Sequence, residues 1–213
     1  MESKKAVKQL KEIERLVVEF GEEPRLAAEG WGEDWQTLVA IILSAQTRDS
    51  KTVVVCGDLF RKYEKVGDLA GASLKDIEKV IGSVNFYKTK ARNIRETARI
   101  IVSRGVRLQV SGFRKKEDMV RELMRLPGVG RKTANVYLVA VHGVAAIGVD
   151  THVGRIARKL GWTREKEPHK VERDLEGLFP RRHWNSINWV LVRFGQTVGR
   201  SRGREDVVLG EII

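Results

Sequence analysis

The stretch LPGVGRKTANVY, residues 126–137, joins two apolar helical patterns through a turn that is rich in glycine. Pro127, Gly128 and Gly130 fall within four positions, whereas a plain helix connection needs only one residue that stops a helix. Glycine permits unusual backbone angles and has no side chain to hold a ligand away, so such a turn can present backbone N–H groups to an anion at the positive end of the following helix. The turn predicts a phosphate-binding hairpin between two helices, and an ordinary αα-hairpin is the alternative.

The chain as a whole is strongly basic. Its 213 residues include 40 Lys and Arg against 28 Asp and Glu, which gives a formal net charge of +12 and a sequence pI of about 10.0. An excess of this size suits a protein that binds a phosphate backbone. A heat-resistant protein with many charged surface side chains is the alternative. The hydrophobic fraction of 42% is enough for a folded core.

The single cysteine, Cys56, limits the chemistry that the chain can support. One cysteine excludes an internal disulfide and any site built from four cysteines, whether for zinc or for an iron–sulfur cluster. Cys56 lies in the apolar run KTVVVCGDLF, where we expect it to be a small core residue. The N-terminal segment is amphipathic but mixed in charge, unlike a signal peptide, and no apolar run is long enough to cross a bilayer.

Apolar residues recur at helical spacing along most of the chain, and glycines stop the patterns. Strand-like alternation is scarce, and only residues 143–149 suggest an extended segment. We expect Asp49 or Ser50, Ser73 and Asp150 to cap helices, Gly105 to close one, and Pro168 to open one after Glu167. The tail, residues 200–213, has no clear period. The chain is therefore predicted to be all-α, with about ten short helices, over residues 7–20, 35–46, 53–63, 74–82, 88–105, 117–126, 131–143, 151–162, 169–179 and 183–195.

Lys132 and Asp150 are the candidates for chemistry. Lysine is unfavourable in the first turn of a helix, because the helix dipole is already positive there, and the same field favours a neutral, nucleophilic amine. Asp150 lies 18 residues later, a gap that one helix and a return loop would fill, so both residues could face one cleft. A carboxylate there could accept a proton or stabilise positive charge. An ordinary surface lysine and a simple N-cap are the alternatives, and Asp150 could serve both purposes.

These residues carry a family likeness. The stretch LPGVGRKTANVYLVAVHGVAAIGVDTHVGRIARKLGW, residues 126–162, resembles the helix-hairpin-helix element, Gly/Pro-rich loop and aspartate signature of the endonuclease III family of DNA glycosylases. The segments IILSAQTRDSKT and GSVNFYKTKARNI, residues 41–52 and 82–94, resemble two further DNA-facing segments of that family. The resemblance covers roughly residues 35–195.

The resemblance implies an all-α fold in which two helical domains flank a DNA-binding cleft. One domain, residues 34–144, would be a central helical bundle that contains the helix-hairpin-helix motif at about residues 117–142. The other would combine residues 1–33 with residues 145–213.

The resemblance also implies roles for individual residues. Lys132 falls on the family's catalytic lysine and Asp150 on its catalytic aspartate. Gln46 falls on the residue that fills the gap left by an extruded base, and Phe86 on an apolar wedge beside it. The further DNA contacts would be Tyr87, Lys90, Gly128, Val129, Gly130, Arg131, Thr133, Thr151 and His152.

The function that the resemblance implies is base excision repair. The protein would be a DNA glycosylase with AP lyase activity that removes damaged bases, with oxidised pyrimidines expected, through a lysine Schiff base. Its partner would be double-stranded DNA that contains a damaged base or an abasic site. We expect a soluble monomer in the cytoplasm, associated with the nucleoid. The alternatives are a mismatch or oxidised-purine glycosylase of the same fold, a non-catalytic helix-hairpin-helix DNA-binding protein, and a basic structural protein.

One departure from the family concerns a cofactor. Most members carry an iron–sulfur cluster on four cysteines near the C-terminus, but residues 194–213, FGQTVGRSRGREDVVLGEII, contain no cysteine. The chain thus resembles a branch without the cluster, and we expect no cofactor and no metal. Trp184, Trp189, Val190 and Phe194 are either an apolar substitute for the cluster or ordinary core residues.

Overall fold

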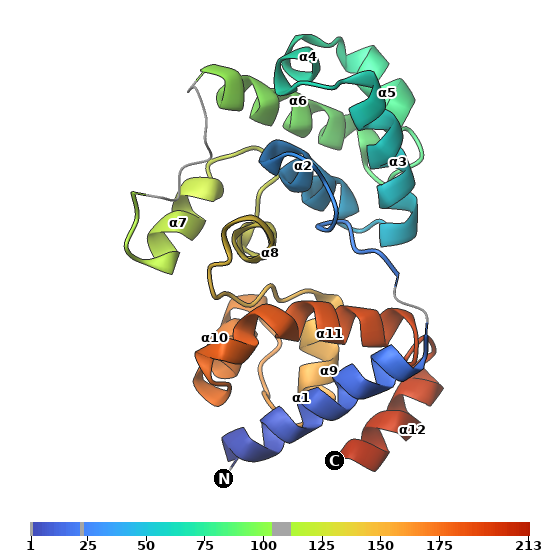
Figure 1. Cartoon of the computed structure of the whole chain (residues 1–213), viewed down its shortest axis with the longest axis vertical. Coiled ribbons are helices and arrows are strands. Elements are labelled where there is room, and N and C mark those ends of the chain that lie inside the picture. Colours follow the sequence, from blue (N-terminus) through green and yellow to red (C-terminus); the bar gives the residue numbers. More distant parts are fainter. Residues whose placement is uncertain (1, 22–23, 104–111) are drawn as a thin grey trace. The chain divides into compact units, whose positions relative to one another are not determined.

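The computed structural model describes residues 2–21, 24–103 and 112–213, and these residues form α-helices and one short 3-10 helix, with no strand among them (Figure 1). The all-α prediction is confirmed. The chain divides into two compact units: unit 1 comprises Met1–Pro24 and Gly143–Ile213, and unit 2 comprises Arg25–His142. No described helix has the length and apolar character that a membrane span requires.

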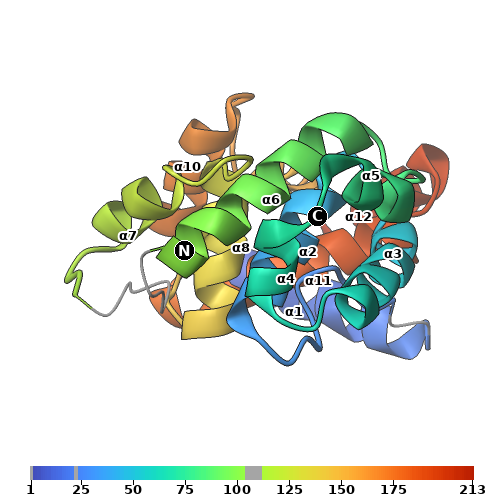
Figure 2. The same cartoon turned by 90° about the horizontal axis from the view of Figure 1, so that it is seen from above.

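Unit 2 is built around a helix that is apolar on almost every side. Residues 37–43 of this helix, α2, are all buried, and α2 contacts α3, α6 and α8. The longest helix of the unit, α6, runs beside the short helices α4 and α5 (Figure 2). The helices of unit 2 are α2 (Asp34–Ser44), α3 (Asp49–Lys62), α4 (Val66–Gly71), α5 (Leu74–Ile81), α6 (Tyr87–Ser103), α7 (Lys116–Leu123) and α8 (Arg131–His142).

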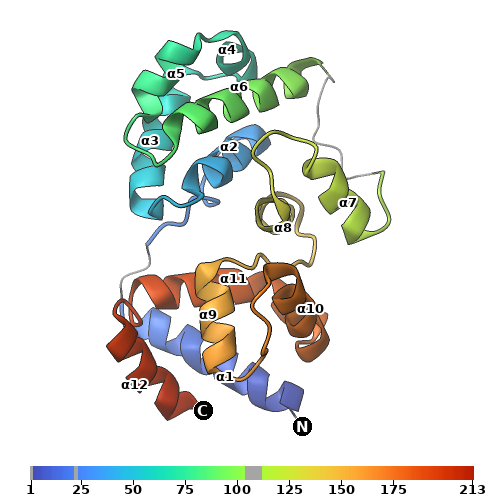
Figure 3. The same ribbon diagram turned by 180° about the vertical axis from the view of Figure 1, so that it is seen from behind.

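Unit 1 packs the N-terminal helix against helices from the C-terminal part of the chain. The apolar stripe of α1, which includes Ile13 and Val17, lies along α11, and α9 stands against the same helix (Figure 3). Ile156 of α9 and Val190 of α11 are fully buried. The helices of unit 1 are α1 (Glu2–Glu19), α9 (Thr151–Lys159), α10 (Pro168–Leu178), η1 (Arg181–His183), α11 (Trp184–Gln196) and α12 (Arg202–Ile212).

Most of the predicted helix caps are confirmed. Ser73 Oγ accepts a hydrogen bond from the backbone N–H of Asp76 at 3.1 Å, and Asp150 Oδ1 accepts one from Val153 N–H at 2.9 Å. Pro168 is the first residue of α10. The predicted helix stop at Gly105 lies outside the described residues.

The predicted cap at Asp49 or Ser50 is wrong. The N-cap of α3 is Arg48, whose side chain makes no capping hydrogen bond. Asp49 is the first helical residue, and its Oδ1 accepts a hydrogen bond from Ala27 N–H, 22 positions earlier, at 3.2 Å. The Asp49 carboxylate therefore holds a distant loop.

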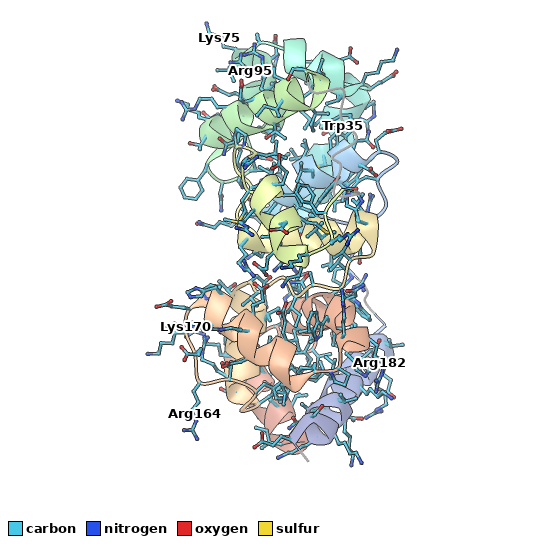
Figure 4. The ribbon with its side chains drawn as sticks, turned by 90° about the vertical axis from the view of Figure 1, so that its left-hand side faces the viewer. Trp35, Lys75, Arg95, Arg164, Lys170 and Arg182 are labelled. Atoms are coloured by element: carbon cyan, nitrogen blue, oxygen red, sulfur yellow. The ribbon has the colours of Figure 1, made fainter. Side chains whose placement is uncertain are left out.

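The assignment of residues 25–33 to the second domain is also wrong, because these residues belong to unit 2. In addition to the bond from Ala27 to Asp49, the Trp31 ring meets the Phe60 ring edge to face with 4.9 Å between centroids. Trp35 meets the same ring at 5.3 Å (Trp35 is labelled in Figure 4). These contacts tie the segment to α3.

The tail holds a helix that its sequence does not predict. Helix α12 is capped by Ser201, and its Glu205 is only 1% exposed. The Glu205 carboxylate accepts hydrogen bonds from Arg155 Nη2 at 2.7 Å and Lys159 Nζ at 2.8 Å, both on α9. A buried carboxylate is stable only when it is paired in this way. The three charges therefore fix α12 on α9.

We expect Glu205→Gln to lower the free energy of unfolding by about 2 kcal/mol, because it leaves the partly buried Arg155 without its anion and Lys159 with Asp206 alone. Burial opposes ionisation of Glu205, but the hydrogen bonds from Arg155 and Lys159 outweigh it, so its pKa lies below the ordinary value of 4.5. The Glu205 carboxylate therefore stabilises the fold fully at pH values above the ordinary pKa of 4.5. This stabilisation is lost as the pH falls through the lowered pKa of the folded protein.

Denaturant unfolding over a pH series checks this prediction. The difference in stability between the wild type and Glu205→Gln should shrink in acid. Glu211→Gln, at an exposed position on the same helix, is the matched control and should have little effect. A difference that stays constant into acid would contradict a role for the charge of Glu205.

Candidate nucleic-acid interface and catalytic residues

The glycine turn between α7 and α8 is fixed by close packing against two other helices of unit 2. Thr97 Oγ1 on α6 donates a hydrogen bond to the carbonyl oxygen of Pro127 at 3.1 Å. Gly128 has a φ of +80°, and a Cβ there would lie 2.8 Å from Asn93 Nδ2 and 3.2 Å from Ile42 Cγ2. Both the backbone angle and the lack of space therefore require glycine at this position.

The turn leads directly into the first turn of α8. Ala134 N–H donates to Gly130 O at 2.9 Å, which starts the helix at Arg131. The earliest N–H groups of any helix lack intrahelical acceptors, and the first turn of α8 contains no acidic residue to neutralise its positive end. Gly130 is exposed, and a Cβ there would meet nothing within 4 Å. An anion could thus approach these amides closely.

Three residues in and beside this turn were predicted to contact DNA, but one has its side chain paired and two have theirs buried in unit 2. Arg131 donates to both carboxylate oxygens of Glu117 on α7, at 2.9 and 2.7 Å, and these bonds lower the pKa of Glu117 to about 2. Arg131 therefore ties α7 to α8. The side chains of Val129 and Thr133 are buried, so contact with DNA at these two positions would have to use the backbone. The Val129 N–H already donates to Leu126 O at 3.1 Å.

Lys132 differs from its neighbour Arg131. It is the second residue of α8, its side chain is half-buried, and its Nζ makes no hydrogen bond or ion pair within the described part of unit 2. Among the described residues of unit 2, none therefore occupies the Lys132 amine.

Asp150, Thr151 and His152 form a second group, in unit 1. Asp150 is the N-cap of α9, so that one of its carboxylate oxygens accepts from Val153 N–H. Thr151 is exposed. His152 Nδ1 lies 3.2 Å from Arg155 Nη2, and a Cβ at Gly195 would overlap the His152 ring. The ring is therefore held against α11.

Gln46 and Phe86 are brought together in unit 2. They are the two non-glycine residues of the described chain that have a positive φ, at 55° and 57°. Both side chains are exposed, Phe86 by 64%. Asn85 joins their loops, because its side-chain amide donates to Gln46 O and its backbone N–H donates to Thr47 Oγ1 at 3.2 Å. Tyr87, half-buried, follows as the first residue of α6.

The prediction that Lys90 contacts DNA is wrong for its ammonium group. The side chain is 6% exposed, and Nζ donates to Leu43 O at 2.7 Å, Ala45 O at 2.6 Å and Thr47 Oγ1 at 3.0 Å. All three N–H groups are therefore used inside unit 2. Burial lowers the pKa of Lys90 to about 8, so that the amine is still mostly protonated at neutral pH.

The chain does not fit an iron–sulfur cluster, because it has one cysteine where the cluster needs four. Cys56 is fully buried in α3, which raises its pKa to about 12 and leaves no thiolate ligand.

The segment that follows α11 is held to that helix by a backbone hydrogen bond from Gly199 N–H to Phe194 O at 2.7 Å. Of the proposed apolar substitutes, Val190 and Phe194 are fully buried, whereas Trp184 and Trp189 are half-buried.

Basic side chains project from both units, as the high net charge requires. Lys75 on α5 of unit 2 is exposed, and so are Arg164 and Arg182 of unit 1 (Figure 4). The basic surface is consistent with a polyanionic partner, but it does not distinguish DNA from other polyanions.

Comparison with known proteins gives a consistent family. Residues 39–181 match the family model of the HhH-GPD superfamily of base excision DNA repair proteins. The chain is 36% identical to endonuclease III of Thermotoga maritima, over 78% of this chain and 75% of that protein. It is 38% identical to endonuclease III of Synechocystis, over 78% and 74% of the two chains.

A solved structure agrees with these relatives. An endonuclease III trapped as a covalent intermediate with DNA, in an estranged-adenine complex, superimposes with a TM-score of 0.76. The match has 31% identity and covers 91% of this chain and 86% of that one. The chain therefore belongs to the endonuclease III family, within the HhH-GPD superfamily of base excision DNA repair proteins.

Proposed function

We propose that Lys132 is the nucleophile in base excision and that Asp150 assists it. The protein is a base excision repair DNA glycosylase with associated AP lyase activity. The observation that carries the assignment of the nucleophile is the state of Lys132. It is a half-buried amine with no hydrogen bond or ion pair to any described residue of unit 2, in the first turn of α8, directly after a glycine turn suited to phosphate.

The proposed reaction begins when a damaged nucleotide is extruded from the duplex. Lys132 Nζ attacks C1′ of the sugar, and the bond from C1′ to the base breaks with its electron pair on the base. The sugar ring then opens to give a Schiff base between Nζ and C1′. This cationic imine acidifies the C2′ proton, and loss of that proton breaks the C3′–O bond and cuts the strand on the 3′ side.

Asp150 is proposed to stabilise positive charge on the sugar or to accept a proton during these steps. One of its oxygens is held by Val153 N–H, which fixes the orientation of the carboxylate and leaves the other oxygen for the substrate. The capping role and the catalytic role that the sequence suggested are therefore compatible. None of the steps assigned to these two residues requires a metal or a redox cofactor.

The proposal assigns DNA backbone contacts to the amides of Gly128, Gly130 and Arg131, because the Val129 N–H already donates to Leu126 O. It assigns gap-filling contacts to Gln46 and Phe86. The free amides at the start of α8 support the first assignment, and the exposure of both side chains supports the second. We further propose that the substrate is an oxidised pyrimidine in duplex DNA and that the active protein is a monomer. A panel of duplexes, each with one defined lesion, tests this choice against mismatched thymine and oxidised purines.

The nucleophile is tested by borohydride reduction on a duplex that contains an abasic site. Wild-type protein should give a covalent adduct, and Lys132→Ala should give none while it still binds the duplex. Lys132→Arg keeps the positive charge but replaces the amine with a guanidinium that stays protonated, so it should also give no adduct. A trapped adduct with either variant would show that another amine is the nucleophile.

Asp150→Asn separates the charge of Asp150 from its capping role. Asparagine caps helices as well as aspartate does, so the melting temperature should stay close to that of the wild type. Loss of the carboxylate should slow single-turnover base removal by about 100-fold or more, with little change in duplex affinity. If the rate is unchanged, Asp150 is only a cap.

Two glycine variants test the turn. Gly128→Ala combines an unfavourable backbone angle with a clash against Asn93, so we expect it to cost about 2 kcal/mol of stability and to weaken DNA binding. Gly130→Ala meets no neighbour and should keep the stability of the wild type. Its methyl group should still weaken binding if a phosphate approaches there, which titration of labelled duplex would measure. Unchanged affinity in both variants would place the phosphate elsewhere.

A further inference from the structure

Two exposed residues of unit 2 are held in a conformation that side chains other than glycine rarely adopt. Gln46 follows the end of α2, and Phe86 precedes the start of α6. Each has a positive φ, which costs roughly 1–3 kcal/mol at a residue with a side chain. Such strain persists only where the surroundings fix the backbone, so some interaction must hold both loops.

That interaction is centred on Lys90. From the first turns of α6, its side chain reaches the end of α2, where its ammonium bonds to the carbonyl groups of Leu43 and Ala45. These carbonyls lie at the negative end of α2, where a helix lacks its own donors and favours a cation. The third N–H bonds to the side-chain Oγ1 of Thr47, so Lys90 is bonded to residues on both sides of Gln46.

The same network continues to Phe86. Thr47 Oγ1 accepts from Lys90 and also from the backbone N–H of Asn85, while the side chain of Asn85 donates to the carbonyl of Gln46. Phe86 O in turn accepts from the backbone N–H of Lys90 at 3.0 Å. The Lys90 ammonium therefore bonds to the loop of Gln46, the Lys90 backbone bonds to Phe86, and Asn85 joins the two loops directly.

We propose that Lys90 is a positioning residue: its buried ammonium fixes Gln46 and Phe86 as one rigid pair that enters the duplex when a nucleotide is extruded. The proposal rests on the proposed function for its role in DNA, but not for the network itself. Lys90 touches neither substrate nor reacting atoms, and it acts only through the loops that it holds.

The network is tested first without DNA, by hydrogen exchange of Lys90→Met. Methionine fills a similar volume but donates no hydrogen bond, so amide exchange at residues 45–47 and 84–86 should accelerate at least about tenfold, while that of α8 stays unchanged. The matched control is Lys88→Met, which removes the same charge from an exposed side chain two residues away, and it should exchange as the wild type does. Exchange in Lys90→Met that equals the wild type would overturn the proposal.

The second test compares borohydride trapping on an abasic site in duplex and in single-stranded DNA. A single strand has no stack to fill, so only the duplex reaction should need the rigid pair. We expect Lys90→Met to slow trapping on the duplex by about 10-fold or more and to leave the single-strand rate within about 2-fold. An equal loss on both substrates would mean a general structural defect, and no loss on either would mean that the pair needs no fixing; both would overturn the proposal. If the wild type trapped neither substrate, the proposed function would fail, and hydrogen exchange would still decide whether Lys90 holds the loops.

Discussion

The contact between Gly128 and the helices α2 and α6 is the constraint on which the proposed site depends. It leaves no space for a methyl group, and the bond from Thr97, also on α6, to Pro127 holds the same turn. Because α8 begins immediately after this turn, the contact also sets where Lys132 and the first amides of the helix lie. A nucleophile on a flexible side chain needs such a rigid base if it is to meet a sugar carbon repeatedly in one geometry.

Each unit uses a buried charge to hold segments that are distant in sequence. In unit 2, the ammonium of Lys90 joins the end of α2 to the start of α6. In unit 1, the carboxylate of Glu205 joins α12 to α9, the helix that Asp150 caps. Both groups are fully supplied with partners, which offsets the cost of removing a charge from water. The ion pairs of Glu205 also attach the C-terminal tail firmly to unit 1, although the tail has no cysteines to bind a cluster.

The sequence predicts local features of this protein well. The glycine turn, the caps at Ser73 and Asp150 and most helices follow from patterns within a few residues, and the structure confirms them. The features that were missed depend on long-range contacts. Lys90 bonds to a carbonyl 47 positions away, and Glu205 bonds to an arginine 50 positions away. The sequence around each residue therefore does not distinguish it from an ordinary surface charge. Arg131 likewise pairs with Glu117, 14 positions away, which no local pattern indicates. The positive φ angles of Gln46 and Phe86 have no signal in the sequence at all, because neither residue type favours that conformation.

Cys56 has a practical consequence for watching this protein at work. It is the one sulfhydryl of the chain, it lies within the core of unit 2, and its raised pKa keeps it in the unreactive thiol form. A maleimide fluorophore offered to the native protein would therefore find almost nothing to modify. A cysteine engineered at an exposed loop could carry a single dye without prior removal of the native one, so that insertion into a duplex could be followed by fluorescence in real time.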